Sequence, residues 1–432
     1  MVNVIGTNII SSLGFTTEEN FNAVEQGISG IKHYEAGIFN LPEPFMASLI
    51  DKEKLNDEFV RHCCGLDPQS PKTRDSDFRQ NDGYTNLEKA SILSVYTANK
   101  EAQIDLSSAR TIFILSTTKG NIELMNNEQL IMNNEGKNHY SLFTIHYSLY
   151  LWHTAELIAK FFKNPNTPVV VSNACISGAA AQIVAQRELE AENYDYAVVV
   201  GVDLLSKFII SGFQSFKALS PTLCQPFDKN RCGLNLGEAA GTIIFCNEQL
   251  TMNNEQLAMN NGVRLVAGAV RNDATHISAP SRTGEGSFRA LSSILNTQIP
   301  NLKSQISNLK SQIAFINAHG TATPYNDAME MNAIVRAGLK DIPVNALKSY
   351  FGHTLGAAGI VETIISMRAL NEGLVLKTLG FEENEQLIMN NEQFTLNVCK
   401  ENMKTDKKCF IKMMSGFGGV NAALLYTTDY TN

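Results

Sequence analysis

One thiol lies where a strand-like segment gives way to a helical one. Cys175 follows the β-branched run 169–171 and precedes an apolar helical pattern that begins at Ile176. The start of a helix leaves backbone N–H groups unpaired and carries partial positive charge, which favours a thiolate and can stabilise an oxyanion beside it. The position therefore predicts that Cys175 is a nucleophile.

Two later segments each supply a histidine beside glycine. His319 lies in the segment 317–327, and His353 lies in the segment 345–359. A thiolate that attacks a thioester needs a positioned imidazole and hydrogen-bond donors for the developing oxyanion. A single cysteine is usually a small core residue and a single His-Gly is usually a turn, but the three residues together favour catalysis. We predict a Cys/His/His site.

Alternating strand-like and helical segments must position these residues. Buried apolar runs at 111–115, 196–201 and 240–245 alternate with helical stretches such as 179–189, and a second series of the same style begins near residue 263. This pattern is typical of a layered α/β protein. We expect an N-terminal half at 1–246, which carries the nucleophile, and a C-terminal half at 262–432, which carries the two histidines. Both histidines follow a predicted strand or turn, where α/β enzymes place their sites.

Composition narrows the classes of function. The chain has 432 residues, more than one hydrophobic core usually supports, with 44% hydrophobic residues and a formal net charge of −8. Scattered basic residues argue against a nucleic-acid partner, and the longest apolar stretches are too short for a membrane span. The eight cysteines are few and lack paired metal-ligand spacing. They predict a reducing compartment, the cytoplasm, and no metal site.

Near-identical polar tracts interrupt this pattern. They are rich in Asn, Gln and Glu and recur in insertions near 121–150, 247–261 and 384–393, and a separate tandem repeat forms a further insertion near 301–313. Stacked repeat folds need contiguous units of about 20–50 residues, and these tracts are short and dispersed. We interpret them as surface insertions, which cost little because loop-closure entropy rises only with the logarithm of length. Deletion of 125–135 is expected to leave activity intact.

Motifs along nearly the whole chain resemble the β-ketoacyl-acyl-carrier-protein synthases of the thiolase superfamily, of the elongating Cys/His/His type. They run from Ser-Ser-Leu-Gly at 11–14, through Cys175 and Pro-Phe-Asp-Lys-Asn-Arg at 226–231, to Gly-Phe-Gly-Gly-Val-Asn at 416–421. Each motif is weak alone, and their joint presence in this order is specific. The resemblance implies a thiolase-like duplicated five-layer αβαβα fold.

The resemblance also implies a reaction. Cys175 would take an acyl chain from a carrier-protein thioester, and a malonyl unit on carrier protein would lose carbon dioxide and attack the acyl-enzyme. The product is a β-ketoacyl thioester, in fatty-acid or specialised polyene or polyketide-like synthesis. His319 and His353 are suited to stabilise the enolate charge. No bound cofactor is implied, because the substrates are carried on the phosphopantetheine of acyl carrier protein.

Further site residues come from the same resemblance. Lys348 and Glu362 match a buried ion pair beside the histidines, and each makes the other less costly to bury. Phe417 matches a gating phenylalanine, whose backbone N–H and that of Cys175 would form the oxyanion hole. Gly418 is expected to support the close approach of the main chain there.

Contacts to the carrier arm and to other chains are implied as well. Thr321 and Thr323 match hydroxyls that bind the phosphopantetheine amides, and Ser278 is at a similar contact position. The expected partners are acyl carrier protein and a second copy of the chain, with a chain-length-factor-like subunit as the alternative partner. Phe213 and Phe216 are expected at the acyl pocket or at the dimer interface.

Departures from the pattern leave alternatives open. Met413-Met414-Ser415 replaces the common Asn-Ser-Phe, which suggests a specialised pathway such as aryl-polyene synthesis. A non-catalytic chain-length-factor-like subunit typically lacks the cysteine. A degradative thiolase would need a second cysteine near the C-terminal glycines, and none follows Cys409. An enzyme disabled by the insertions is the third alternative.

Overall fold

Two five-stranded sheets, joined edge to edge into one ten-stranded sheet, form the frame of the molecule. The computed structural model describes residues 1–63, 83–126, 149–252, 262–297, 309–383, 387–389 and 392–428. The N-terminal sheet consists of β1 (Val2–Ser11), β4 (Thr111–Ser116), β5 (Val169–Val171), β6 (Tyr196–Asp203) and β8 (Ala239–Asn247). The C-terminal sheet consists of β9 (Arg264–Asn272), β10 (Ile313–Asn317), β11 (Val344–Asn345), β16 (Cys409–Gly416) and β17 (Val420–Thr427).

The two sheets have the same topology. Their strand orders are β5-β4-β6-β8-β1 and β11-β10-β16-β17-β9. In each half, the last strand of the sheet along the chain, β8 or β17, is antiparallel to both neighbours, and the other adjacent pairs within that half are parallel. The halves join edge to edge through Val2 with Leu265 and Asn3 with Arg264. This repeated order confirms the predicted duplicated α/β fold.

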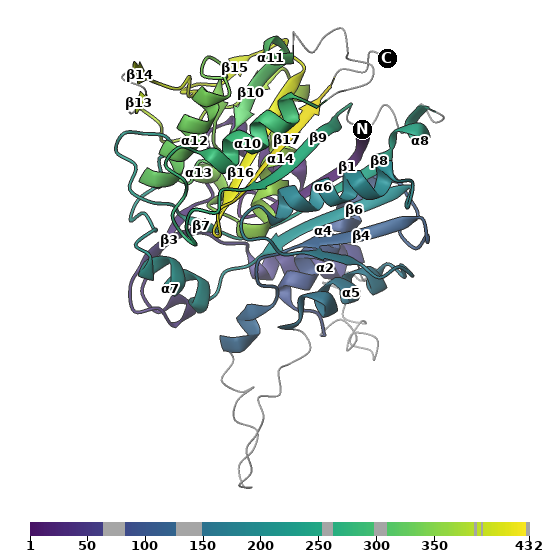
Figure 1. The fold of residues 1–432 in the computed structure, drawn as a ribbon. Coiled ribbons are helices and arrows are strands. Elements are labelled where there is room, and N and C mark those ends of the chain that lie inside the picture. The colour runs from purple at the N-terminus through teal and green to yellow at the C-terminus, as the bar shows by residue number, and fades with distance from the viewer. Residues whose placement is uncertain are drawn as a thin grey trace.

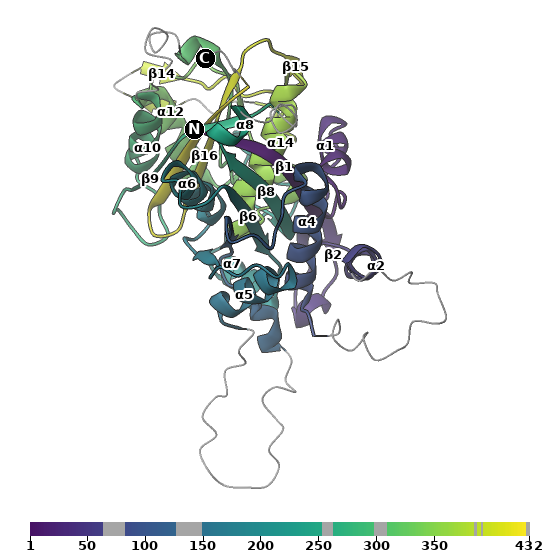
Figure 2. The same ribbon diagram turned by 90° about the vertical axis from the view of Figure 1, so that its right-hand side faces the viewer.

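Helices form three layers around the sheets. The outer face of the N-terminal sheet is covered by α2 (Lys52–Cys63), α4 (Asn86–Ala102) and α5 (Leu151–Phe161). The outer face of the C-terminal sheet is covered by α10 (Glu285–Leu295) and α12 (Pro324–Arg336). Between the sheets lie α6 (Ser177–Glu190) and α14 (Ala358–Asn371). Figures 1 and 2 show α2 and α4 on one side of the molecule and α10 and α12 on the other.

The central helices touch backbone to backbone. A Cβ atom on Gly359 would lie 2.6 Å from the backbone nitrogen of Ala179, and one on Gly178 would lie 2.9 Å from the carbonyl oxygen of Gly356. Only glycine permits this approach, because any side chain would overlap the facing backbone. The crossing brings the first turns of α6 and α14 together, and Cys175 immediately precedes one of them.

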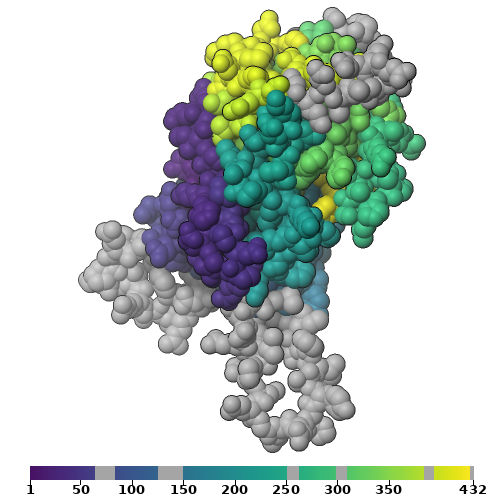
Figure 3. Space-filling model, turned by 90° about the vertical axis from the view of Figure 1, so that its left-hand side faces the viewer, coloured from purple at the N-terminus to yellow at the C-terminus, as the bar shows by residue number. Residues whose placement is uncertain are grey.

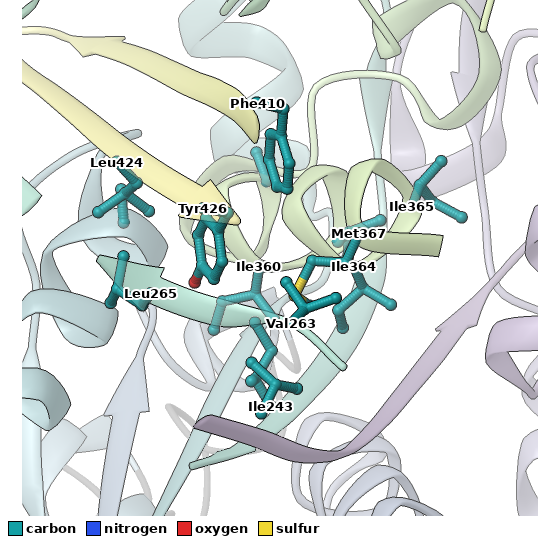
Figure 4. Packing of buried hydrophobic residues seen from close by; sticks show 14 of the residues in the cluster. Ile243, Val263, Leu265, Ile360, Ile364, Ile365, Met367, Phe410, Leu424 and Tyr426 are labelled. Carbon is teal, nitrogen blue, oxygen red and sulfur yellow. The ribbon is translucent and has the colours of Figure 1, made fainter. Parts of the chain in front are cut away.

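Apolar packing fixes α14 in this position. Ile360, Ile364 and Met367 of α14 lie against Ile243 of β8 and Tyr426 of β17 (Figure 4). Helix α14 is buried on nearly all sides, as a helix between two sheets must be. The layer that supports the site is therefore the most deeply buried part of the fold.

The remaining elements are short or lie at the edges. They are α1 (Thr17–Glu25), β2 (Lys32–Tyr34), β3 (Phe45–Ser48), α7 (Lys207–Ser215), β7 (Leu236–Gly237), α8 (Glu248–Met252), α11 (Leu309–Gln312), α13 (Lys348–Phe351), β12 (Leu374–Val375), β13 (Leu387–Met389), β14 (Glu392–Phe394), β15 (Met403–Lys404) and the 3-10 helices η1 (Ile38–Asn40), η2 (Ile122–Asn126) and η7 (Leu355–Ala357). Within the described ranges, no helix has the length and apolar character needed to cross a membrane.

Some predicted boundaries differ from the structure. The insertion predicted at 301–313 ends earlier, because Ile313 opens β10 and is fully buried. Helix α12 starts at Pro324, since proline at the first helical position lacks only an N–H group that would have no partner within the helix. Most of the other predicted insertions, including 127–148 and 253–261, lie outside the described residues.

Candidate active site

A sharp turn projects the Cys175 thiol. Ala174 has a φ of 46°, a left-handed conformation that is strained for a residue with a side chain. The Ser177 hydroxyl holds the turn, because its Oγ accepts the Asn173 N–H at 2.8 Å and donates to the Ala174 carbonyl at 2.6 Å. Cys175 follows directly and is 8% exposed. The predicted strand-to-helix junction is therefore present.

Burial decides the protonation of this thiol. It raises the pKa of Cys175 to about 11. The positive charge of Lys348 and hydrogen bonds from the backbone N–H groups of Phe417 and Cys175 itself lower this pKa, but by less than burial raises it. The expectation that the helix start favours a thiolate is wrong for the free protein. A helix N-terminus stabilises a negative charge by about 0.3–1 kcal/mol. This is less than the free energy of a single pKa unit, about 1.4 kcal/mol, so it cannot offset the effect of burial. At neutral pH the nucleophile is a thiol, and its reaction requires a base.

The two histidines meet beside the thiol. Their ring centroids lie 5.1 Å apart with the planes at 84°, and both side chains are buried. Backbone contacts hold both: the His319 N–H donates to Glu330 Oε1 at 2.7 Å, and the His353 N–H donates to the Asn235 carbonyl at 2.7 Å. The Leu355 N–H faces His353 Nδ1 at 3.4 Å, so Nε2 carries the hydrogen of the neutral ring.

Both imidazoles are uncharged at neutral pH. Burial holds the pKa of His319 and of His353 well below the usual range, and the nearby charge of Lys348 lowers both further. A neutral imidazole can accept a proton at one nitrogen and donate from the other. The pair can therefore serve as a base toward the thiol and as a donor toward an oxyanion.

A buried ionic cluster lies behind the histidines. Lys348 Nζ donates to Glu362 Oε1 at 2.6 Å, as the predicted ion pair requires. A second ammonium, Lys412 Nζ, donates to Glu362 Oε2 at 2.5 Å. The sequence reasoning missed Lys412, although a lysine inside the apolar run 409–414 was a usable signal.

Two other acidic groups were also missed. Glu330 accepts the backbone N–H groups of His319 and Gly320, and Asp203 accepts Lys119 Nζ at 2.8 Å and the Gly356 N–H at 2.7 Å. Both carboxylates hold loops that carry site residues. They lie within helix and strand patterns whose packing partners are distant in the sequence, so no local signal marked them.

A cavity of about 470 Å³ opens onto the thiol and both histidines. Seven predicted site residues line it: Cys175, His319, His353, Phe417, Thr321, Thr323 and Ser278. In Figure 3, a small yellow area from the C-terminal part of the chain lies recessed between teal and green segments, which also contribute to this lining. Lys348 and Glu362 are not part of the wall. Gly418 forms the adjacent turn with a φ of 88°.

Aromatic rings flank the entrance of this cavity. The ring of Phe417 is 41% exposed, stacks on Phe213 at 5.9 Å and meets the edge of Phe216 at 5.7 Å. In the wall of the same cavity, the hydroxyl oxygens of Thr321 and Thr323 are 2.7 Å apart. Phe213 and Phe216 line this cavity, which is one of the two locations that the sequence predicts for them.

Comparison with known families identifies the chain. The model of the beta-ketoacyl synthase N-terminal domain matches residues 1–250, and that of the C-terminal domain matches residues 263–382. The chain belongs to the beta-ketoacyl synthase family. The predicted family and enzyme class are confirmed, and the site lies at the meeting of the two family domains.

Individual beta-ketoacyl synthases agree with this assignment. The chain is 26% identical to 3-oxoacyl-[acyl-carrier-protein] synthase 2 of Vibrio cholerae, over 98% of both chains, and 25% identical to that of Vibrio harveyi, over 98% and 97%. Among solved structures, the ishigamide ketosynthase/chain length factor matches with a TM-score of 0.79 at 22% identity over 99% of both chains. A beta-ketoacyl synthase from Burkholderia phymatum matches with a TM-score of 0.79 at 20% identity, over 99% and 98%.

Proposed function

We propose that this chain condenses an acyl group held on Cys175 with malonyl-acyl carrier protein, with loss of carbon dioxide, to give β-ketoacyl-acyl carrier protein in fatty-acid or specialised polyene-type synthesis. The observation that carries the proposal is the convergence of the Cys175 thiol and two uncharged imidazoles, from His319 and His353, on one cavity. The ion pair of Lys348 and Glu362 lies directly behind them.

The first step loads the thiol. An imidazole takes the Cys175 proton, the sulfur attacks the thioester carbonyl, and the carrier-arm thiolate leaves with that proton. The backbone N–H groups of Cys175 and Phe417, which already face the sulfur, are suited to the oxyanion of the tetrahedral intermediate. A protonated thiol in the resting enzyme makes this proton transfer essential.

The second step forms the carbon–carbon bond. The bond between the malonyl α-carbon and its carboxylate breaks, carbon dioxide leaves, and the electron pair passes to the thioester enolate. Neutral imidazole donors, such as Nε2–H of His353, stabilise the enolate oxygen. The α-carbon then attacks the acyl carbonyl, and the Cys175 sulfur leaves as thiolate and takes up a proton from solvent.

The cavity wall suits a carrier arm. Thr321, Thr323 and Ser278 place hydroxyl groups along the wall that leads to the thiol, where they can bind the amides of phosphopantetheine. Phe417 lies over the same passage with its ring partly exposed, in keeping with a gate. The partner in this proposal is acyl carrier protein, and no bound cofactor is required.

The end of the N-terminal sheet supports self-association. Among the described strands, β5 pairs on one side only, with β4, and its three valines at 169–171 are half-buried. An apolar strand edge of this kind tends to pair with another chain. We infer a homodimer through β5, with a chain-length-factor-like subunit as the alternative partner. No disulfide joins the described cysteines, in keeping with the reducing compartment, the cytoplasm, that we infer for this chain.

Separate assays of the two half-reactions test the proposal. Cys175→Gln is expected to lose acyl loading and to keep malonyl decarboxylation, whereas His319→Ala and His353→Ala are expected to lose decarboxylation. Cys232→Ala is a matched control, because Cys232 also lines the cavity but is not the proposed nucleophile. This variant should load acyl groups on Cys175 as the wild type does. Loading of acyl groups on the Cys175→Gln variant at the wild-type rate would contradict the assignment of the nucleophile.

A further inference from the structure

Lys412 is a lysine in the interior of a sheet. It lies in the middle of β16 beside Asn317 of β10, and its side chain is 0% exposed. The ammonium donates to Asn317 Oδ1 at 2.6 Å, to the Ala318 carbonyl at 3.2 Å and to Glu362 Oε2 at 2.5 Å. All three N–H groups are used, so the charge is fully hydrogen-bonded although buried.

These contacts fix the backbone that carries His319. Lys412 binds Asn317 and Ala318, immediately before the histidine. From the other side, the carboxylate of Glu330 accepts the N–H groups of His319 and Gly320. The imidazole is thus attached to a segment held on both sides by buried charged groups, which allows little displacement toward or away from the thiol.

Lys412 also changes the charge of the ionic cluster. Lys348 and Lys412 share the single carboxylate of Glu362, which leaves one net positive charge when all three are ionised. Burial lowers the pKa of Lys412 to about 8, although the negative charge of Glu362 raises it in part. The ammonium is therefore mainly protonated at neutral pH. The positive charge of Lys412 in turn lowers the pKa of both site histidines.

Other charged groups lie around the same site. Beside the effect of burial, Lys348 on α13 lowers the pKa of both histidines, and Lys119 after β4 lowers that of His353. The carboxylates that bind these cations or the His319 backbone are Glu362 on α14, Asp203 at the end of β6 and Glu330 on α12, and the charge of Asp327 on α12 acts on Glu330. Of these cations, Lys119 is paired with Asp203 at 2.8 Å, whereas Lys348 and Lys412 share Glu362. Lys412 therefore adds one positive charge to a pair that would otherwise be neutral.

We propose that Lys412 is a positioning residue for the condensation: its bonds to Asn317, Ala318 and Glu362 fix the backbone of His319, and its ammonium places an additional positive charge beside the two imidazoles that take the Cys175 proton. This inference rests on the proposed function, because it concerns a step of that reaction. An imidazolium cannot take the thiol proton, so acyl loading should fall at acid pH once the imidazoles protonate. Removal of the Lys412 charge should make them protonate at higher pH.

The test is the pH dependence of Cys175 loading from acyl-carrier protein, followed by intact-protein mass spectrometry. Lys412→Met removes the charge at similar length, Lys412→Gln removes it but keeps N–H donors should the Met variant not fold, and Lys412→Arg keeps it. The neutral variants are expected to shift the acid limb of the loading rate upward by roughly half to one pH unit. The Arg variant and the exposed control Lys408→Met should keep the wild-type limb.

The outcomes distinguish failure of the Lys412 proposal from failure of the proposed function. An unshifted acid limb in the neutral variants would overturn the proposal that the charge of Lys412 acts on the imidazoles, even if the rates fall at every pH, since a structural defect alone has that signature. Wild-type protein that loads no acyl group from any carrier protein would instead overturn the proposed function.

Discussion

The crossing of the two central helices offers a quantitative test of how the fold positions the site. In Gly359→Ala, the new Cβ would lie 2.6 Å from the Ala179 backbone nitrogen, where ordinary contact begins at 3.4 Å. The helices must separate by the difference, 3.4 − 2.6 = 0.8 Å. Overpacking of this kind destabilises proteins by about 1–3 kcal/mol. Because α6 begins two residues after Cys175, the separation should also displace the thiol, and a displacement of about 1 Å can lower a rate about a hundredfold.

Urea unfolding and the rate of Cys175 loading measure the two effects together. Gly212→Ala is the matched control, because a Cβ at Gly212 in α7 meets nothing within 4 Å. Alanine there should be neutral or stabilise by up to about 1 kcal/mol, since it restricts the unfolded chain. Equal unfolding free energies and loading rates for Gly359→Ala and the wild type would refute the reasoning, because they would show that the helix contact can relax without moving the site.

Two further predictions concern the buried charges and the thiol. Glu362→Ala leaves Lys348 and Lys412 without their shared carboxylate and should lower the free energy of unfolding by about 3–5 kcal/mol. Glu372→Ala on the exposed end of the same helix should cost less than about 1 kcal/mol, and similar losses for both would argue against the cluster. Alkylation of Cys175 by iodoacetamide should accelerate with pH up to about 11, the pKa that burial gives the thiol in the folded protein, and a plateau near pH 8 would contradict that burial.

The sequence was most informative where chemistry and local structure coincide. Cys175 at a strand-to-helix junction and the two His-Gly segments were sufficient to predict a three-residue site, and the structure places all three on one cavity. The duplicated arrangement followed from two series of similar segments. Its five layers depended on the family resemblance, because periodicity alone does not show that α6 and α14 cross at Gly178 and Gly359.

The role of Lys412 and the protonation of Cys175 became visible only in the structure, because they depend on burial and on contacts between residues far apart in the sequence. Lys412 shares the carboxylate of Glu362 across 50 residues of sequence, and no local pattern reports such a partner. The pKa of Cys175 was misjudged for the same reason: the helix start is visible in the sequence, but the opposing and larger effect of desolvation is set by the full fold.

The central claim is tested most directly by one reaction. Wild-type protein is incubated with acyl-carrier protein and malonyl-carrier protein, and the carrier proteins are analysed by intact-protein mass spectrometry beside a Cys175→Ala control. We predict a β-ketoacyl-carrier protein extended by two carbons, with one carbon dioxide released per product, and no product from the Cys175→Ala variant. Absence of acyl loading on the wild-type thiol, or equal product from the variant, would contradict the account and favour a non-catalytic subunit.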